Sequence, residues 1–346
     1  MKNKVDYIIV GQGIAGTWLS HELISRGYDV VIFNHETANT SSNKAAGLYN
    51  PITGRKMMLT WKAGNFFPSL EENYQKLEAE LGERFLHPIP MYRPFKSIED
   101  QNDWQGKQEE NVYLSYLQKF SPRSLEIENI KDPYGGIILS HTGYVDLPRL
   151  INAFRSYLKD KGHYISEMFS EDKLYIDSDK VKYENWEAKK VIFCEGVQVA
   201  KYWTDLLFRP VRGEIIDIVC DLPNTLIINQ GVFILPKNGY FTVGSTYDHS
   251  LLTHEPQKEG IENIVQRLRK IFGGDFSIVK EQAGIRPATH DRKPYIGFHK
   301  EFQTFAIFNG FGTKGVSLSP YFAKHFADVL EGKVEIEEEV DVQRIY

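Results

Sequence analysis

A glycine-rich turn near the start of the chain constrains the fold more than any other feature of the sequence. Residues 5–10 form a short apolar run, residues 14–26 place apolar side chains at helical spacing, and residues 30–33 form a second apolar run. The turn between the first run and the helix reads Gly11-Gln12-Gly13-Ile14-Ala15-Gly16. A strand, a glycine turn, a helix and a second strand within about thirty residues make one βαβ unit. The sequence therefore predicts an α/β fold.

The three glycines of this turn fit the pattern G-x-G-x-x-G, which is typical of dinucleotide binding. Gly11 permits the tight turn, Gly13 lets the backbone approach a pyrophosphate, and Gly16 allows the helix to pack closely on the strand. The helix N-terminus, at Ile14 and Ala15, supplies N–H donors and a partial positive charge. We therefore expect a dinucleotide cofactor here, and the alternative is a glycine-rich turn that binds no ligand.

A carboxylate that binds the cofactor's ribose is expected at the end of the second strand. Asn34 occupies that place, and Glu36 follows two residues later. An asparagine can accept a hydrogen bond from a ribose hydroxyl but carries no charge, so both residues stay candidates. No arginine lies in this turn, which argues against a ribose 2′-phosphate and hence against NADP.

The length and composition of the chain narrow its class. The 346 residues favour two domains, and 42% hydrophobic with 25% charged residues is the usual globular mixture. A net charge of −5 disfavours a dedicated nucleic-acid binder, although a local basic patch stays open. Cys194 and Cys220 are the only cysteines, which indicates a reducing cytoplasm rather than a disulfide framework. No apolar stretch approaches the ~20 residues of a membrane span.

Apolar periodicity predicts the remaining elements. Helices are expected at residues 69–81, 147–161, 261–272 and about 319–330. Short β-like runs fill residues 164–193, and in the β-rich segment 211–247 strands are expected at 214–220, 225–235 and 240–245. The polar segment 97–112 is predicted to be a surface excursion.

An ordered series of short motifs then resembles a known family along nearly the whole chain. The motifs are the glycine turn, Ser41-Ser42 with Ala45-Ala46-Gly47, Gly143-Tyr144-Val145-Asp146-Leu147, Val191 to Gly196, Pro210-Val211-Arg212-Gly213-Glu214, Pro236 to Thr246, Gly284-Ile285-Arg286-Pro287, and Asn309 to Pro320. Together they resemble the D-amino-acid oxidase and glycine oxidase superfamily of FAD-dependent oxidoreductases. The chain departs from that pattern at Glu195, where the family usually has alanine, and at Glu214, where it has glutamine.

The resemblance implies an architecture and a cofactor site. It implies a discontinuous Rossmann-type FAD domain, at 1–85, 141–208 and 284–346, with an inserted antiparallel-sheet substrate domain at 86–140 and 209–283. It implies FAD contacts at Gly11, Gly13, Ile14, Ala15, Gly16, Asn34, Ser41, Ser42, Ala45, Ala46, Gly47, Gly196, Gly310, Gly312, Thr313, Lys314, Gly315 and Val316.

Four side chains are candidates for chemistry. In the resembled oxidases, the arginine at the position of Arg286 holds the substrate carboxylate through both arms of its guanidinium; the alternative role is a structural salt bridge. Lys314 lies in the glycine loop that the family places beside the flavin, where it is expected to stabilise negative charge; the alternative is an exposed loop lysine. Tyr240 and Tyr247 flank a hairpin expected to line the substrate cavity, and ordinary packing is the alternative for each.

The implied reaction is oxidation of a C–N bond, in which hydride passes from a small amino acid or carboxylate-bearing secondary amine to flavin N5. A second hypothesis is oxidative trimming of carboxymethylaminomethyl-uridine in tRNA. It arises because residues 46–51 and 312–315 also resemble the FAD domain of the bifunctional enzyme that does this. The acidic net charge and the lack of room for the fused methyltransferase domain favour the small-molecule substrate. A third hypothesis is a flavin-binding subunit without chemistry of its own.

Overall fold

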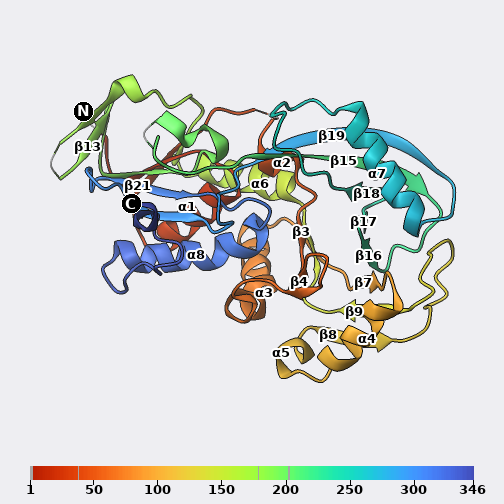
Figure 1. Cartoon of the computed structure of the whole chain (residues 1–346). Helices are drawn as coiled ribbons and strands as arrows, with labels where there is room; N and C mark the ends of the chain where they lie inside the picture. Colours follow the sequence, from red (N-terminus) through yellow and green to blue (C-terminus); the bar gives the residue numbers. More distant parts are fainter. Residues whose placement is uncertain (1–2, 38, 178, 202) are drawn as a thin grey trace.

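The protein is described from a computed structural model, which covers residues 3–37, 39–177, 179–201 and 203–346. Two large β-sheets, each covered by helices, form the frame of the molecule (Figure 1). The mixed α/β fold confirms the predicted class. In the described part of the chain, no helix is both long and apolar enough to cross a membrane.

The first sheet contains the predicted βαβ unit. Its order is β11-β2-β1-β14-β13-β12, and β21 pairs with β14 and β20 with β21. The bounds are β1 Asn3–Val10, β2 Val30–Phe33, β11 Tyr164–Ile165, β12 Leu174–Ile176, β13 Val181–Tyr183, β14 Trp186–Phe193, β20 Tyr295–Phe298 and β21 Phe305–Asn309. Strands β11, β2, β1, β14 and β21 run parallel, so their carboxyl ends meet at one edge of the sheet. Open α/β sheets bind ligands at that edge.

Four helices pack against one another beside the first sheet. They are α1 Ile14–Ser25, α3 Ala63–Leu81, α6 Leu147–Asp160 and α8 Gly315–Leu330. Helix α1 packs against α8, and α3 also contacts α8 (Figure 1). Helix α6 begins where the sequence predicts, because Asp146 caps it by accepting the Arg149 N–H at 3.2 Å and Pro148 occupies its first turn.

The second sheet is mainly antiparallel, with the order β19-β15-β18-β17-β16-β7-β9-β8. The bounds are β7 Met91–Pro94, β8 Leu117–Ser121, β9 Gly136–Leu139, β15 Val211–Cys220, β16 Ile227–Gln230, β17 Val232–Pro236, β18 Phe241–Gly244 and β19 Phe276–Arg286. Helix α7, Lys258–Ile271, covers it and buries Ile261, Ile264, Leu268 and Ile271, the apolar stripe expected from the sequence (Figure 1).

Shorter elements connect the two sheets. A three-stranded sheet joins β3 Leu48–Tyr49, β10 Gly143–Val145 and β6 Leu86–Pro88, and a hairpin pairs β4 Ile52–Thr53 with β5 Met58–Leu59. The remaining helices are α2 Ser41–Lys44, α4 Ile98–Lys107 and α5 Asn111–Leu114, with 3₁₀ turns at Glu171–Lys173, Gly196–Lys201 and Val342–Ile345.

Several element boundaries differ from the prediction. Helices α3 and α8 begin at Ala63 and Gly315, earlier than expected, with Pro68 and Pro320 inside them. The run expected as one strand at 225–235 is two strands, because Gly231 turns the chain with a φ of +79°. The segment 97–112, predicted as a surface excursion, is mainly exposed; it is largely helical and buries Trp104.

The two large sheets fall almost entirely into the chain segments assigned to the two predicted domains. Strand β19 is the exception, because it continues to Arg286, just beyond the expected boundary at 283. We propose that the two sheets are the frames of an FAD domain and a substrate domain.

Candidate cofactor and active site

One large cavity extends from the carboxyl edge of the first sheet to the second sheet. Its volume is about 2130 Å³, about twice the upper end of the usual range of ~300–1,000 Å³ for ligand pockets. Among the residues proposed as cofactor contacts, all but Gly16 line this cavity. Such a volume can hold a dinucleotide together with a second molecule.

The glycine turn forms one end of the cavity. Gly11 has a φ of +94°, and a Cβ on Gly16 would lie 2.0 Å from the carbonyl oxygen of Gly11. Gly16 therefore allows α1 to approach β1, as predicted, and does not face the ligand space. The Ile14 N–H donates to Ser42 Oγ at 3.1 Å, which ties the turn to α2.

Asn34 and Glu36, the two ribose candidates, have different surroundings. Asn34 lines the cavity, and its Oδ1 accepts the Gln12 N–H at 2.9 Å while its Nδ2 donates to the Tyr164 hydroxyl at 2.9 Å. The Glu36 carboxylate does not line the large cavity and pairs with Lys159 at 2.9 Å and Arg155 at 3.3 Å. Those cations lower the pKa of Glu36. This geometry favours Asn34 as the group that faces a ribose.

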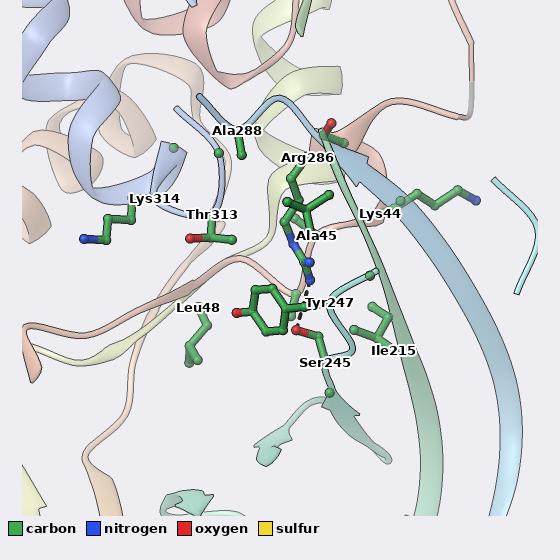
Figure 2. Close-up of a pocket in the computed structure, with 18 of the residues that line it drawn as sticks. Lys44, Ala45, Leu48, Ile215, Ser245, Tyr247, Arg286, Ala288, Thr313 and Lys314 are labelled. Atoms are coloured by element: carbon green, nitrogen blue, oxygen red, sulfur yellow. Dashed lines mark hydrogen bonds between the residues drawn. The ribbon is translucent and has the colours of Figure 1, made fainter. Parts of the chain in front are cut away.

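The last glycine loop lies at the start of α8. Gly310 and Gly312 have φ values of +81° and +53°, and Lys314 is the N-cap residue without a side-chain capping bond. The first N–H groups of a helix have no intrahelical acceptor, so they are available to a ligand. Lys314 lines the cavity, and burial together with Arg292 lowers the pKa of its ammonium. Figure 2 shows this side chain pointing away from Arg286.

Arg286 lies at the end of β19 with its guanidinium in the cavity (Figure 2). Its Nη2 donates to Ser245 Oγ at 2.9 Å and its Nη1 to the carbonyl of Thr246 at 3.2 Å. The ring of Tyr247 lies 4.7 Å from the guanidinium carbon, in cation–π geometry. A Cβ on Gly213 would come within 2.2 Å of Nη2, so the absence of that atom makes room for the guanidinium. Burial lowers the pKa of Arg286.

A buried ion pair lies behind this arginine. Arg212 Nη2 contacts Glu214 Oε1 at 2.5 Å, and both side chains are almost fully buried. Glu214 Oε2 also accepts the Thr246 hydroxyl, and the Glu214 N–H donates to Thr246 Oγ1 at 2.7 Å. The glutamate found here in place of the expected glutamine is thus satisfied by an arginine and a hydroxyl, and it holds the segment after β18 that carries Ser245 and Tyr247.

The two candidate tyrosines lie in different places. Tyr247 lines the cavity, is 65% exposed and faces Arg286. Tyr240 is not among the residues that line the cavity. It precedes β18 whereas Ser245 follows it, and a four-residue strand separates its two ends by about 13 Å. The carboxylates of Asp217 and Asp146 lie near Tyr240, and burial raises its pKa.

Comparison with known proteins identifies the family. The family model for FAD dependent oxidoreductases matches residues 6–329 of the 346. The chain belongs to this family of FAD-dependent oxidoreductases. The predicted superfamily is thereby confirmed, and FAD is its cofactor.

Relatives of this oxidoreductase include glycine oxidases and bifunctional proteins. A glycine oxidase of Bacillus licheniformis is 24% identical over 361 residues, covering 96% of this chain and 94% of that protein. A bifunctional protein for tRNA 5-methylaminomethyl-2-thiouridine biosynthesis from Marinobacter nauticus is 22% identical, covering 93% of this chain and 54% of that protein. The crystal structure of a glycine oxidase from Bacillus cereus superposes with a TM-score of 0.73, at 22% identity and 96% coverage of both chains.

The site of this oxidoreductase fits FAD. The bare backbone of Gly13 lines the cavity at the N-terminus of α1, where a pyrophosphate can approach N–H groups. Gly47 is required at the other loop, because a Cβ there would lie 1.9 Å from the carbonyl oxygen of Val145. We therefore propose that α1 holds the pyrophosphate and that the start of α8 faces the flavin end.

Sequence reasoning missed a second group of cavity residues. Asn50, Arg55, Thr60, Arg93 and Arg267 line the cavity on the side of the second sheet. Over the whole lining, twelve Lys and Arg face five Asp and Glu, although the chain carries a net charge of −5. Asn50 lies within the segment 46–51, but no motif marks the other four residues, which come from two turns, one strand and one helix.

Proposed function

We propose that this oxidoreductase oxidises the C–N bond of a small amino acid or secondary amine that bears a carboxylate. The observation that carries the proposal is Arg286, a guanidinium that faces the cavity between Ser245 and Tyr247. It forms no ion pair with a carboxylate among the described residues. The planar fork of arginine fits the two oxygens of a carboxylate better than an ammonium does.

The residues of the chain have distinct parts in this proposal. FAD supplies the two-electron acceptor, and the protein supplies binding, orientation and electrostatics. Arg286 binds the substrate carboxylate, and Tyr247 covers the guanidinium and narrows access to it. Helix α8 directs its N-terminal N–H groups, with Lys314, toward developing negative charge. No protein base is assigned, because an amine that arrives deprotonated needs none.

Anaerobic bleaching of the flavin tests the proposal directly. Glycine, sarcosine and a panel of D-amino acids are mixed with the oxygen-free protein, and absorbance of oxidised flavin is followed. Loss of the absorbance with at least one carboxylate-bearing amine is expected. A flavin that stays oxidised with every amine in the panel, but is reduced by dithionite, would instead support a flavin-binding subunit without chemistry of its own.

Arg286→Lys gives the matching residue test. The lysine keeps the charge but loses the second hydrogen bond, and one charge-assisted bond contributes ~1.5–3 kcal/mol. We expect KM to rise by about 10- to 100-fold while the flavin content of the protein stays the same. Unchanged kinetics on a carboxylate-bearing substrate would show that Arg286 is structural.

A second candidate function is oxidative trimming of carboxymethylaminomethyl-uridine in tRNA. The observation that favours it is the excess of cations in the cavity lining, which suits a phosphate-bearing substrate. The modified side chain is itself a secondary amine with a carboxylate, so Arg286 would serve both functions. Flavin bleaching by tRNA that carries this group, but not by unmodified tRNA, would favour the second candidate over the first.

A further inference from the structure

A row of arginines continues outward from Arg286. Arg286 donates to Ser245 Oγ, and Arg267 of α7 donates from Nη1 to the carbonyl of the same Ser245 at 3.1 Å. Arg55, in the β4–β5 turn, lines the cavity with Arg267. Burial lowers the pKa of the Arg267 guanidinium, and the charge of Arg55 lowers it further. Arg93 of β7 donates to the carbonyl of Gly54, next to Arg55, at 3.0 Å. We call Arg55, Arg93 and Arg267 the outer arginines.

The outer arginines have no anionic partner in the described chain. Arg267 and Arg93 donate to backbone carbonyls, and neither they nor the exposed Arg55 ion-pair with a carboxylate. Burial lowers the pKa of Arg93, and the charge of Asp100 opposes that effect although the two side chains form no ion pair. Arginines are seldom buried unless they are paired, and of the three only Arg93 is buried. Three guanidiniums without a carboxylate partner that line one cavity favour an anion there in the functional state.

Unpartnered polar atoms lie beside the same arginines. Arg93 is 8% exposed, and its Nε is buried without an acceptor. Thr60 is 7% exposed, and its hydroxyl also has no partner, as does Asn50 Oδ1. Both residues line the cavity with Arg93. Native proteins rarely leave buried polar atoms unsatisfied, so these three atoms, just behind the cavity wall, keep hydrogen-bonding capacity for water or a ligand.

We propose that the outer arginines, with Thr60 and Asn50, form a second oxyanion subsite that receives a group of the substrate distinct from the carboxylate held by Arg286. The proposal deepens the proposed function and rests on it. The substrate class is then an amine with two anionic groups, in which the second group is a carboxylate or a phosphate. Hydroxyl and amide groups of Thr60 and Asn50 would contact neutral polar atoms next to that anion.

Binding of a matched series of amines tests the subsite. Sarcosine has one carboxylate, iminodiacetate has two, and N-(phosphonomethyl)glycine has a carboxylate and a phosphonate. Dissociation constants are measured on the FAD-loaded protein from the change in flavin absorbance without turnover, and by equilibrium dialysis. We expect at least one of the two dianionic ligands to bind about tenfold more tightly than sarcosine, as one charge-assisted contact implies.

Charge reversal separates the subsite from the Arg286 site. Arg55→Glu should abolish the advantage of the dianionic ligand and leave sarcosine binding unchanged, and Arg267→Met should reduce the same advantage. Arg286→Lys should weaken all three ligands alike, so failure of the subsite and failure of the proposed function are distinguishable. Arg123→Glu is the matched control, because Arg123 is exposed and does not line the cavity.

A binding experiment with tRNA distinguishes the two sources of the second anion. If the phosphate belongs to RNA, unmodified tRNA binds the wild type with a steep salt dependence, and Arg55→Glu weakens it whereas Arg123→Glu does not. If it belongs to a small molecule, only the dianionic amines respond to Arg55→Glu. Equal binding of all three amines, together with tRNA binding that Arg55→Glu leaves unaltered, overturns the proposal.

Discussion

At the scale of single residues, the position of the Arg286 guanidinium depends on Gly213, which has no Cβ. A Cβ on Gly213 would lie 2.2–2.4 Å from three atoms of the guanidinium. The arginine side chain is flexible enough to move, but movement takes it away from Ser245. A glycine near the start of β15 is therefore a requirement of the Arg286 position rather than of the strand.

Gly213→Ala should therefore resemble Arg286→Lys. We expect a KM increase of about tenfold or more for a carboxylate-bearing amine, since one charge-assisted hydrogen bond contributes ~1.5–3 kcal/mol, with FAD content unchanged. Gly106→Ala is the control, because a Cβ there meets nothing within 4 Å. Steady-state kinetics on both variants test this expectation. Equal KM values for the two variants would show that substrate binding does not depend on the present position of the guanidinium.

Lys314 is the second residue whose role the geometry makes testable. Lys314 is the N-cap residue of α8 and lines the cavity, and we propose that its ammonium adds to the field of the helix N-terminus. Lys314→Met should lower the flavin reduction potential by tens of millivolts, because loss of ~1.4 kcal/mol shifts a two-electron couple by about 30 mV. Sulfite affinity should fall in parallel, since the adduct is also anionic.

Lys324→Met provides the comparison for this measurement. Lys324 lies on the same helix but is exposed. Equal potentials and equal sulfite affinities in both variants and the wild type would place the Lys314 ammonium outside the flavin's field. The backbone N–H groups at the start of α8 would then carry the stabilisation alone.

At the scale of elements, a buried lysine connects the second sheet to the three-stranded sheet. Lys237 follows β17, and its Nζ lies 3.2 Å from the ring centroid of Tyr144 on β10 and 3.4 Å from the carbonyl of Ala46. Burial lowers the pKa of Lys237 to about 7, against the opposing effect of Asp146 and Asp217. The Lys237 side chain therefore gains or loses its positive charge near neutral pH.

The sign of the resulting pH dependence follows from proton binding. Between pH 7 and about 10 the unfolded chain holds a proton on Lys237 that the folded chain lacks, so the free energy of unfolding rises with pH in this window. Lys237→Met should remove that rise. The stability of the variant relative to wild type should be greatest at or below pH 7 and decrease toward pH 10.

Thermal unfolding across this pH range checks the prediction, with Lys119→Met as an exposed lysine for comparison. A stability difference between Lys237→Met and wild type that is the same at every pH would contradict the lowered pKa.

At the scale of the whole molecule, charge is distributed unevenly. The chain carries a net charge of −5, yet twelve cations and five anions line the cavity. A cleft with an excess of one charge sign concentrates ligands of the opposite sign. Salt weakens this attraction, because exposed charges more than about 10 Å apart are largely screened at 0.1 M ionic strength.

The rate of flavin reduction by an anionic amine should therefore depend on ionic strength. With iminodiacetate, which has a net negative charge, the second-order rate constant should fall several-fold when ionic strength rises from about 0.01 to 0.5 M. Sarcosine, a zwitterion without net charge, serves as the control and should change little. Stopped-flow absorbance gives both rates, and identical salt dependences would show that the cavity does not steer anions.

Local sequence patterns alone predicted much of the cofactor side of this molecule. The spacing of Gly11, Gly13 and Gly16 predicted the order strand, turn and helix that the structure has. This was possible because the three glycines are close neighbours along the chain, so their arrangement is a local property. The resemblance of later loops added Ala45 to Gly47 and Gly310 to Val316, all of which line the same cavity.

Only the tertiary structure decided which side chains face the substrate space. Tyr240 and Tyr247 looked equivalent in sequence, but a strand separates them and directs only Tyr247 to the cavity. Arg55, Arg93 and Arg267 line one cavity, although they come from a turn, a strand and a helix that are far apart along the chain. Whether a charge has a partner depends on such packing between distant segments, and local periodicity carries no information about it.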